Sequence, residues 1–83
     1  MVKILPLRDD LIQYLKKRGL FKRFQKQQKL FSENPFHASL NTELMEPKHL
    51  GVYSFRITRN WRAIFVYCGR NEIEIIDINN HYR

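Results

Sequence analysis

The sequence predicts an α+β fold in which a helical hairpin near the N-terminus packs against a small antiparallel sheet. The main observation is a change of hydrophobic period: apolar residues recur at helical spacing over residues 9–32 and alternate with polar residues over residues 52–79. The second observation is length, because 83 residues make one domain, residues 1–83, with no room for another. We therefore expect the element order β-α-α-β-β-β.

The first half of the chain is expected to contain one strand and two helices. Residues 2–5 are a short apolar run ended by a proline, which is typical of a strand. A helix should begin near Asp9, whose carboxylate complements the helix dipole, and should end at Gly19. A second helix should cover residues 20–32, with one apolar stripe that faces the core.

The second half is expected to form an antiparallel meander. Residues 35–47 are mixed and polar, and we expect only a short strand around Leu40 there, flanked by loops. Alternating patterns then predict strands at residues 52–57, 61–68 and 72–79. The segments between these strands are rich in turn-forming residues.

The register of the meander decides which side chains share a face. We place Ile57 opposite Arg62, and Arg62 opposite Asp77. The face expected to receive the helices carries Tyr53, Phe55, Ile57, Ile64, Val66, Ile73 and Ile75. The other face carries Val52, Ser54, Arg56, Ala63, Phe65 and Tyr67. One end of the sheet should bring together Arg56, Arg62, His81 and Tyr82.

Positive charge is concentrated near the N-terminus. Residues 1–30 hold nine Lys or Arg and two acidic residues, a net +7, whereas residues 31–83 hold six of each. Lys22, Lys26 and Lys29 follow helical spacing along one line about 10 Å long. This asymmetry indicates a polyanionic partner, either nucleic acid or an acidic protein segment, although a solvated helical surface explains it equally well.

The composition argues against several kinds of site. The single cysteine, Cys68, excludes an intrachain disulfide framework and a multi-cysteine zinc site. His37 and His49 have no third ligand at metal-site spacing, so we expect neither a metal nor a cofactor. No apolar run approaches the ~18 residues of a membrane span. We expect a cytoplasmic protein without a membrane partner.

Three motifs stand out in the second half of the chain. They are residues 51–57 (GVYSFRI), residues 60–65 (NWRAIF) and residues 81–83 (HYR). Together they resemble the RelE/ParE toxin superfamily, and most closely its RelE/YoeB-type branch. The resemblance implies a RelE-like fold and the toxin of a type II toxin–antitoxin system, a ribosome-dependent mRNA endoribonuclease (mRNA interferase) that inhibits translation. The implied partners are a cognate acidic antitoxin and the ribosome with bound mRNA.

The same resemblance implies roles for individual residues. Arg62 matches the family's catalytic arginine, and His81 and Tyr82 match its C-terminal catalytic pair. Arg56 matches a recurrent arginine of the preceding strand. In some relatives an arginine stands where this chain has Asp77, so the chain departs from the family pattern at a position that contacts phosphate.

The YoeB-type branch also uses a glutamate upstream of the glycine, and two residues are candidates for it. Glu46 is followed by a proline and fits the motif best. Glu43 fits the distance from Gly51. The sequence leaves both open.

RNA cleavage needs a base for the ribose 2′-hydroxyl, a cation for the pentavalent phosphate and an acid for the departing 5′-oxygen. Glu46 or His81 is the candidate base, and His81 or Tyr82 is the candidate acid. Arg62 and Arg56 are the candidate electrostatic stabilisers. The candidate RNA contacts are Lys22, Lys26, Lys29, Lys48 and Trp61.

Structural explanations remain open for two of these residues. Arg62 could form an ion pair with Asp77, worth about 1 kcal/mol if exposed. Trp61 could cover the end of the core rather than stack on an unpaired base.

Two other functions are alternatives: a ParE-like toxin that binds a DNA topoisomerase without nuclease activity, and a non-toxic basic RNA-binding module. The His-Tyr terminus and the paired arginines favour the nuclease.

Overall fold

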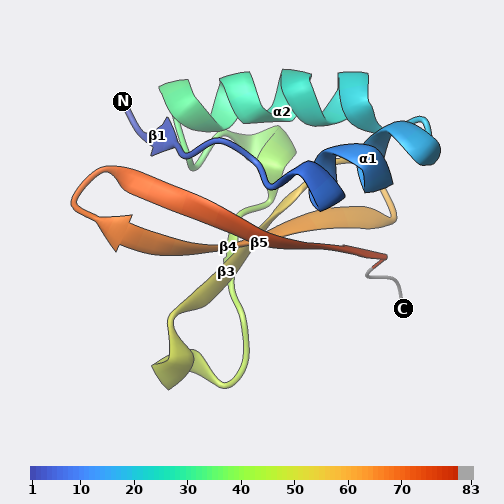
Figure 1. Ribbon diagram of the computed structural model, residues 1–83. Coiled ribbons are helices and arrows are strands. Elements are labelled where there is room, and N and C mark those ends of the chain that lie inside the picture. The colour runs from blue at the N-terminus through green and yellow to red at the C-terminus, as the bar shows by residue number, and fades with distance from the viewer. Residues whose placement is uncertain (81–83) are drawn as a thin grey trace.

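The computed structural model describes residues 1–80 as two helices on a five-stranded sheet (Figure 1). The elements are β1 (Lys3–Ile4), α1 (Asp9–Lys17), α2 (Phe21–Glu33), β2 (Glu43–Leu44), β3 (Val52–Arg56), β4 (Trp61–Gly69) and β5 (Glu72–Asn80). Single 3₁₀ turns flank β2 at Ala38–Leu40 and Lys48–Leu50. The predicted α+β class, the helical hairpin and the C-terminal meander are confirmed.

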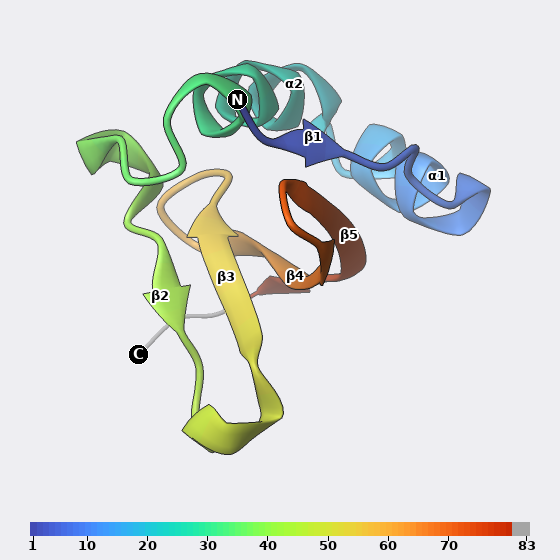
Figure 2. The ribbon, with the colours of Figure 1, turned by 90° about the vertical axis from the view of Figure 1, so that its left-hand side faces the viewer.

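The sheet has the strand order β1-β5-β4-β3-β2. β1 pairs with β5 in parallel, and the other neighbours are antiparallel. Both helices lie on the same side of the sheet, and the β2–β3 connection projects away from them (Figure 2). One face of the meander is therefore covered by helices, which leaves the other face for a site.

The helices begin and end close to the predicted positions. Asp9 and Asp10 lie in the first turn of α1, and Lys16 and Lys17 lie in its last turn, so charges complement the dipole at both ends. Gly19 connects the helices at a φ of +70°, a conformation that strains residues with a side chain. None of the helices in residues 1–80 is long and apolar enough to span a bilayer.

An aromatic core joins α2 to the sheet. The Phe31 ring lies 5.0 Å from the rings of both Phe55 and Phe65, measured between centroids, and the Phe24 ring lies 6.3 Å from Phe55. All four side chains are almost completely buried. Burying one such side chain contributes roughly 1.5–3 kcal/mol, so this cluster supplies much of the hydrophobic stabilisation.

The predicted register of the β3–β4 hairpin is wrong by one residue. The backbone N–H of Ile57 donates to the carbonyl of Trp61 at 2.8 Å, so residues 58–60 alone form the loop. This closure places Arg56, and not Ile57, opposite Arg62.

The one-residue shift exchanges the two faces of β4. Ala63 pairs with Phe55, and Phe65 lies on the same side of the sheet, against the helices. Both residues were expected on the other face. Ile64 and Val66, which were expected to meet the helices, lie on the face that carries Arg62.

A β-bulge corrects the predicted pairing of β5. An Arg62–Asp77 pair would require Tyr67 opposite Glu72, but Tyr67 pairs with Ile73, one residue further along β5. The β-bulge at Ile76 shifts the register by a second residue, so Arg62 lies opposite Asn79 and Asp77 lies opposite Ile64. Asp77 is exposed, and no ion pair joins it to Arg62. The alternative explanation of Arg62 as a partner of Asp77 is therefore wrong. The sequence signal is the pair of adjacent isoleucines, Ile75 and Ile76, which interrupts the alternation.

The short strand predicted around Leu40 is also wrong. Leu40 ends a 3₁₀ turn and is fully buried, and β2 begins three residues later. The backbone N–H of Ser39 donates to His37 Nδ1 at 3.2 Å, and Asn41 has a φ of +45°. Such local bonds between side chain and backbone compete with sheet pairing.

Candidate functional site

Two arginines lie side by side on the sheet face turned away from the helices. Arg56 ends β3, Arg62 is the second residue of β4, and the two are direct cross-strand partners. Neighbouring residues of a strand point to opposite faces, so Phe55 and Ala63 pack toward the helices and the arginines do not. The predicted meeting of the two arginines is confirmed, although the register that produces it differs from the expected one.

Neutral oxygen atoms hold Arg62 in place. This residue is only 5% exposed. Its Nε donates to the Ser54 hydroxyl at 2.8 Å, and its Nη2 donates to the Ser54 carbonyl at 3.2 Å and to the Asn41 carbonyl. No carboxylate of residues 1–80 forms an ion pair with it. The guanidinium is therefore oriented, but its charge is not neutralised by contact.

The surroundings of Arg62 lower the pKa of its guanidinium. Burial is the main cause, the carboxylate of Glu43 opposes the shift, and the neighbouring charge of Arg56 adds to it. Like charges directly opposite each other in a sheet are destabilising. A buried charge without a paired carboxylate costs roughly several kcal/mol. An arrangement with such a cost is typical of a site that binds an anion.

Arg56 carries a buried N–H group that no acceptor in the described residues binds. Its Nε is buried and has no hydrogen-bond partner within the described part of the chain. Buried donors are nearly always paired in native proteins, so an exception points to a missing partner. Nη1 of Arg62 likewise donates no hydrogen bond within residues 1–80. The Arg56 Nε itself is enclosed, and the terminal nitrogens of Arg56 also donate no hydrogen bond within residues 1–80. The terminal N–H groups of Arg56 and Nη1 of Arg62 are therefore the donors that a ligand on this face can reach.

Of the two candidate glutamates, Glu43 is the one associated with the arginines. It pairs with Ser54 across β2 and β3, and its charge raises the pKa of Arg62. Glu46 is exposed in the projecting β2–β3 connection, as is Lys48. Within residues 1–80, neither Glu43 nor Glu46 forms an ion pair with an arginine. Spacing from the glycine therefore identifies the nearby carboxylate better than the Glu-Pro motif does.

The predicted C-terminal pair, His81 and Tyr82, lies outside the described residues. Asn80 is the last residue that the structure describes, and it pairs with Trp61. Since Asn79 pairs with Arg62, β5 reaches the end of the sheet where the arginines lie.

Trp61 packs against the helical hairpin. Its ring lies 5.9 Å from Tyr14 in an edge-on arrangement, and the Arg18 guanidinium lies 3.7 Å above the Tyr14 ring. Trp61 is half-buried and packs on the hydrophobic core. The structure thus shows the tryptophan covering the end of the core, while its stacking on a base stays a prediction.

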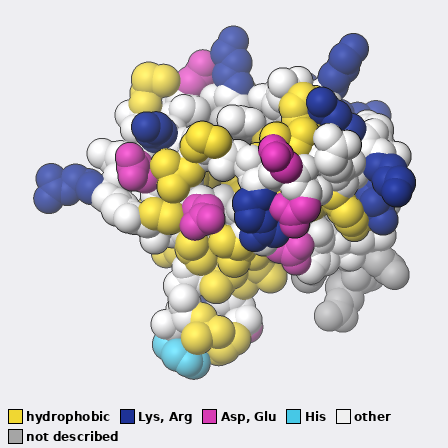
Figure 3. Space-filling view, viewed as in Figure 1, with side chains coloured by type: hydrophobic (Ala, Val, Ile, Leu, Met, Phe, Trp, Pro, Cys, Tyr) yellow, Lys and Arg dark blue, Asp and Glu magenta, His cyan; other side chains and the backbone are white. Residues whose placement is uncertain are grey.

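The three lysines predicted to contact RNA are exposed on α2. Lys22, Lys26 and Lys29 make a basic outer surface on this helix. In the space-filling view, basic side chains project from the top of the molecule, and most of the visible acidic side chains lie lower (Figure 3).

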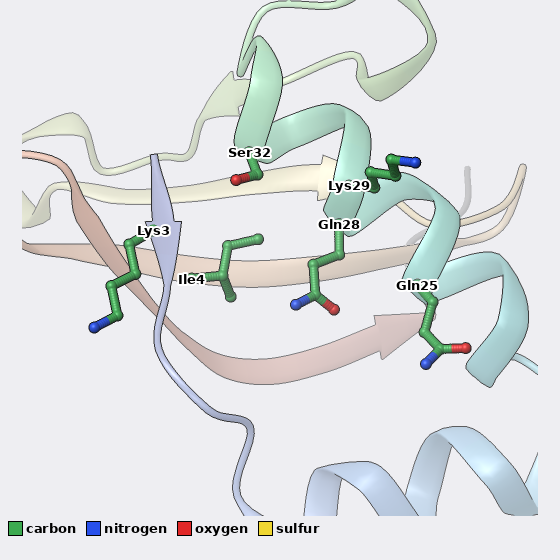
Figure 4. Close-up of a pocket in the computed structure, with 6 residues that line it drawn as sticks. All are labelled: Lys3, Ile4, Gln25, Gln28, Lys29 and Ser32. Atoms are coloured by element: carbon green, nitrogen blue, oxygen red, sulfur yellow. The ribbon is translucent and has the colours of Figure 1, made fainter. Parts of the chain in front are cut away.

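A polar groove separates α2 from β1 (Figure 4). It has a volume of about 500 Å³ and is lined by Lys3, Ile4, Gln25, Gln28, Lys29 and Ser32. No acidic residue lines it, so no carboxylate of its walls competes for the two lysines. The groove lies on the helix side of the sheet and is separate from the arginine pair.

Sequence reasoning missed three residues that surround the arginines: Gln27, Asn41 and Ser54. Gln27 had a recognisable signal, because it falls within the apolar arc of its helix, where a polar side chain is unusual. Ser54 and Asn41 carried no comparable signal. The described residues contain no group of three or more His, Cys, Asp or Glu side chains arranged to hold a metal ion.

Comparison with known proteins identifies the fold. No family model matches the sequence, and no curated protein matches it. A YoeB/ParE toxin from Agrobacterium tumefaciens superposes with a TM-score of 0.71 at 18% identity, over 98% of this chain and 98% of that chain. The YoeB dimer from Staphylococcus aureus gives a TM-score of 0.70 at 20% identity, over 98% and 95%.

A third solved structure adds an antitoxin. The heterotetrameric YoeB–YefM toxin–antitoxin complex from Staphylococcus aureus contains a chain that aligns with a TM-score of 0.68 at 20% identity, over 99% of this chain and 97% of that chain. The resemblance seen in the sequence is thus confirmed at the level of fold. Over nearly its whole length, the chain has the fold of the YoeB and ParE toxins.

Proposed function

We propose that the protein is the toxin of a type II toxin–antitoxin system and cleaves mRNA on the ribosome as a metal-independent endoribonuclease. The observation that carries the proposal is the Arg56–Arg62 pair. The guanidinium of Arg62 is buried without a contacting carboxylate in residues 1–80, and Arg56 is its direct cross-strand neighbour. A phosphodiester gains negative charge in the transition state of cleavage, and oriented cationic donors stabilise that charge. The shared fold with YoeB and ParE toxins supports the proposal.

The proposed chemistry uses the free donors of both arginines. A base takes the proton of the ribose 2′-hydroxyl, the 2′-oxygen attacks phosphorus, and an acid protonates the departing 5′-oxygen. Arg62 and Arg56 stabilise the pentavalent phosphate. Glu43 is our preferred base because it pairs with Ser54, whose hydroxyl binds Arg62, so Glu43 lies on the same face of the sheet as the arginines. His81 or Tyr82 remains the proposed acid.

Two matched variants decide between the glutamates. Glu43→Gln should lower the single-turnover rate of mRNA cleavage by about 10²-fold or more, the loss expected when a general base is removed. Glu46→Gln changes the same functional group at an exposed position and should leave the rate nearly unchanged. The reverse pattern would assign the base to Glu46.

RNA binding is proposed for the basic outer surface of α2. Lys22, Lys26 and Lys29 are exposed and can approach the phosphates of ribosomal RNA. Lys48 and Trp61 are further proposed contacts. Ribosomes translate mRNA in the cytoplasm, so the proposed activity places the protein in the cytoplasm.

The proposed partner is an acidic antitoxin. The Staphylococcus aureus relative forms a toxin–antitoxin complex with YefM. In this chain the net +7 of residues 1–30 suits an acidic segment that folds on the toxin. Co-expression of the cognate partner should restore growth. A basic partner, or a co-purified complex that stays toxic, contradicts this part of the proposal.

Induction of the protein followed by mapping of mRNA 5′ ends tests the central proposal. Growth should stop, and new 5′ ends should appear only in messages that ribosomes are translating. Equal cleavage of naked RNA contradicts ribosome dependence. Arrest with intact mRNA and damaged DNA supports the ParE-like alternative, in which the toxin binds a topoisomerase. Continued growth supports a non-toxic RNA-binding module.

A further inference from the structure

The buried polar side chains of the described chain are Arg62 itself and two that bond to the arginine pair: Ser54 accepts from the Arg62 side chain, and Gln27 donates to the Arg56 carbonyl. Gln27, Ser54 and Arg62 are 7%, 0% and 5% exposed, and the other buried residues of this part of the chain are hydrophobic. Burying a polar side chain costs free energy unless its hydrogen bonds are satisfied. Three such residues in one place therefore form a specific arrangement rather than an average feature of the core.

Ser54 determines the direction of the Arg62 guanidinium. Its hydroxyl accepts from Nε at 2.8 Å, and its carbonyl accepts from Nη2 at 3.2 Å. The Asn41 carbonyl accepts from the same Nη2. These contacts occupy two of the three guanidinium nitrogens and leave Nη1 for a ligand.

Gln27 performs a similar task for the backbone around Arg56. Its Nε2 donates to the Arg56 carbonyl at 2.9 Å and to the Ser39 carbonyl at 3.3 Å. One side chain of α2 therefore ties the end of β3 to the segment that leads into Asn41. Since Asn41 supplies an acceptor to Arg62, the two sets of hydrogen bonds form one connected network.

We propose that Ser54 and Gln27 are positioning residues for the arginine pair: Ser54 directs the Arg62 guanidinium and Gln27 fixes the backbone of Arg56, so that the free N–H groups of both arginines converge on one anion. Neither positioning residue touches the ligand. The identification of that anion as an RNA phosphate rests on the proposed function, whereas the positioning itself does not.

The first test follows Arg62 directly. In nuclear magnetic resonance spectra of ¹⁵N-labelled protein, the Arg62 Nε–H should exchange slowly with water because it is buried and hydrogen-bonded. Ser54→Ala should speed that exchange by about tenfold or more, which corresponds to the loss of about 1.4 kcal/mol of interaction. Ser32→Ala is the matched control, since the Ser32 hydroxyl donates to the Val2 carbonyl at 2.7 Å, away from the arginines.

The second test measures anion binding with inorganic phosphate as the probe. Phosphate should shift the Arg62 Nε resonance of the unaltered protein, and Ser54→Ala should weaken that binding by about tenfold. Gln27→Met keeps the length of the side chain without its donors, and it should weaken binding in the same direction. Gln13→Met, on the exposed side of α1, is its control. Neither control variant should change the resonance or the affinity.

The outcomes separate positioning from a purely structural role. Unchanged exchange and unchanged phosphate affinity in Ser54→Ala and Gln27→Met would overturn the proposal, even if both variants lose stability. If Ser54→Ala does not fold, Ser54→Cys keeps the size of the side chain with a weaker acceptor and should show the same change in smaller degree. Retained wild-type behaviour in Ser54→Cys as well as in Gln27→Met would also overturn it.

The same variants keep this proposal distinct from the proposed function. If Ser54→Ala weakens phosphate binding while neither Ser54→Ala nor Arg62→Ala affects mRNA cleavage, the positioning is supported and the endoribonuclease is wrong. If Arg62→Ala abolishes cleavage while Ser54→Ala changes neither cleavage nor phosphate binding, the endoribonuclease is supported and the positioning is wrong.

Discussion

The two faces of the β3–β4 hairpin alternate along the same strands and yet differ completely in character. On one face Phe55 and Phe65 pack with Phe31 of α2, at ring distances of 5.0 Å. On the other face Arg56 and Arg62 lie opposite each other without a contacting carboxylate in residues 1–80. The first face lowers the free energy of the folded state, and the second raises it.

This contrast shows how a small domain can carry a costly site. A domain of about 80 residues has a limited core, so the stabilisation available to offset a buried charge is small. Alternation along a strand lets adjacent residues serve both needs, with packing on one face and binding on the other. Variants on the two faces should therefore produce opposite patterns of stability and activity.

The largest effect is expected on the apolar face. Phe31→Ala should lower the free energy of unfolding by about 3–5 kcal/mol, because it removes a fully buried ring and leaves a cavity. Urea denaturation measures this change. Gln25→Ala, an exposed position of the same helix, should stay within about 0.5 kcal/mol of the unaltered protein. Equal effects of the two variants would contradict the assignment of the core.

The arginine face should show the opposite pattern. Arg62→Leu should lower the single-turnover rate of mRNA cleavage by about 10²- to 10³-fold, because an electrostatic stabiliser of the transition state is removed. Its free energy of unfolding should fall far less than that of Phe31→Ala, since replacing a buried charge by an apolar side chain is often neutral or stabilising. Full cleavage activity in this variant would remove Arg62 from the proposed catalytic site.

A smaller effect is expected from the exposed lysines of α2. Replacing Lys22, Lys26 and Lys29 together by Gln should weaken ribosome association and flatten its salt dependence. Each lost phosphate contact should reduce the slope of log K against log salt by about 0.7 to 0.9. Cleavage of a message already bound should change little. Arg70→Gln, in the β4–β5 turn, serves as the control, and an unchanged slope in the triple variant would exclude this surface from binding.

The smallest effect is expected from the exposed ion pair between Arg8 and Asp10. The hydrogen bond from Arg8 lowers the pKa of the Asp10 carboxyl from its usual value of 3.8. Because the folded pKa lies below the unfolded one, any stabilisation is present above the unfolded pKa and is lost as the pH falls through the folded pKa.

Arg8→Gln should therefore raise the pKa of Asp10 toward 3.8, as measured by an NMR titration of its carboxyl group. The difference between variant and parent should shrink at high salt, which screens exposed charges. A pKa that does not move would show that the hydrogen bond from Arg8 is absent in solution.

The sequence by itself determined the α+β class, the helical hairpin and the C-terminal meander, but it did not place β2 or predict the parallel pairing of β1 with β5. Hydrophobic period, turn residues and helix-end charges are local properties, and they predicted both helices and the three strands of the meander within about two residues. The two arginines were also identified from the sequence, since their position within the strand motifs needs no knowledge of distant contacts.

Only the tertiary structure decided how the arginine site is assembled. The strand registers depend on one backbone hydrogen bond at Ile57 and on the bulge at Ile76, and a shift of one residue at either place exchanges faces that a local pattern cannot distinguish. The hydrogen bonds around the two arginines come from residues that are distant in the sequence. The Asn41 carbonyl reaches Arg62 across 21 residues, and Gln27 reaches the Arg56 carbonyl across 29. Hydrogen bonds of this kind form only after the chain has folded, because the neighbours of a residue along the chain do not specify them.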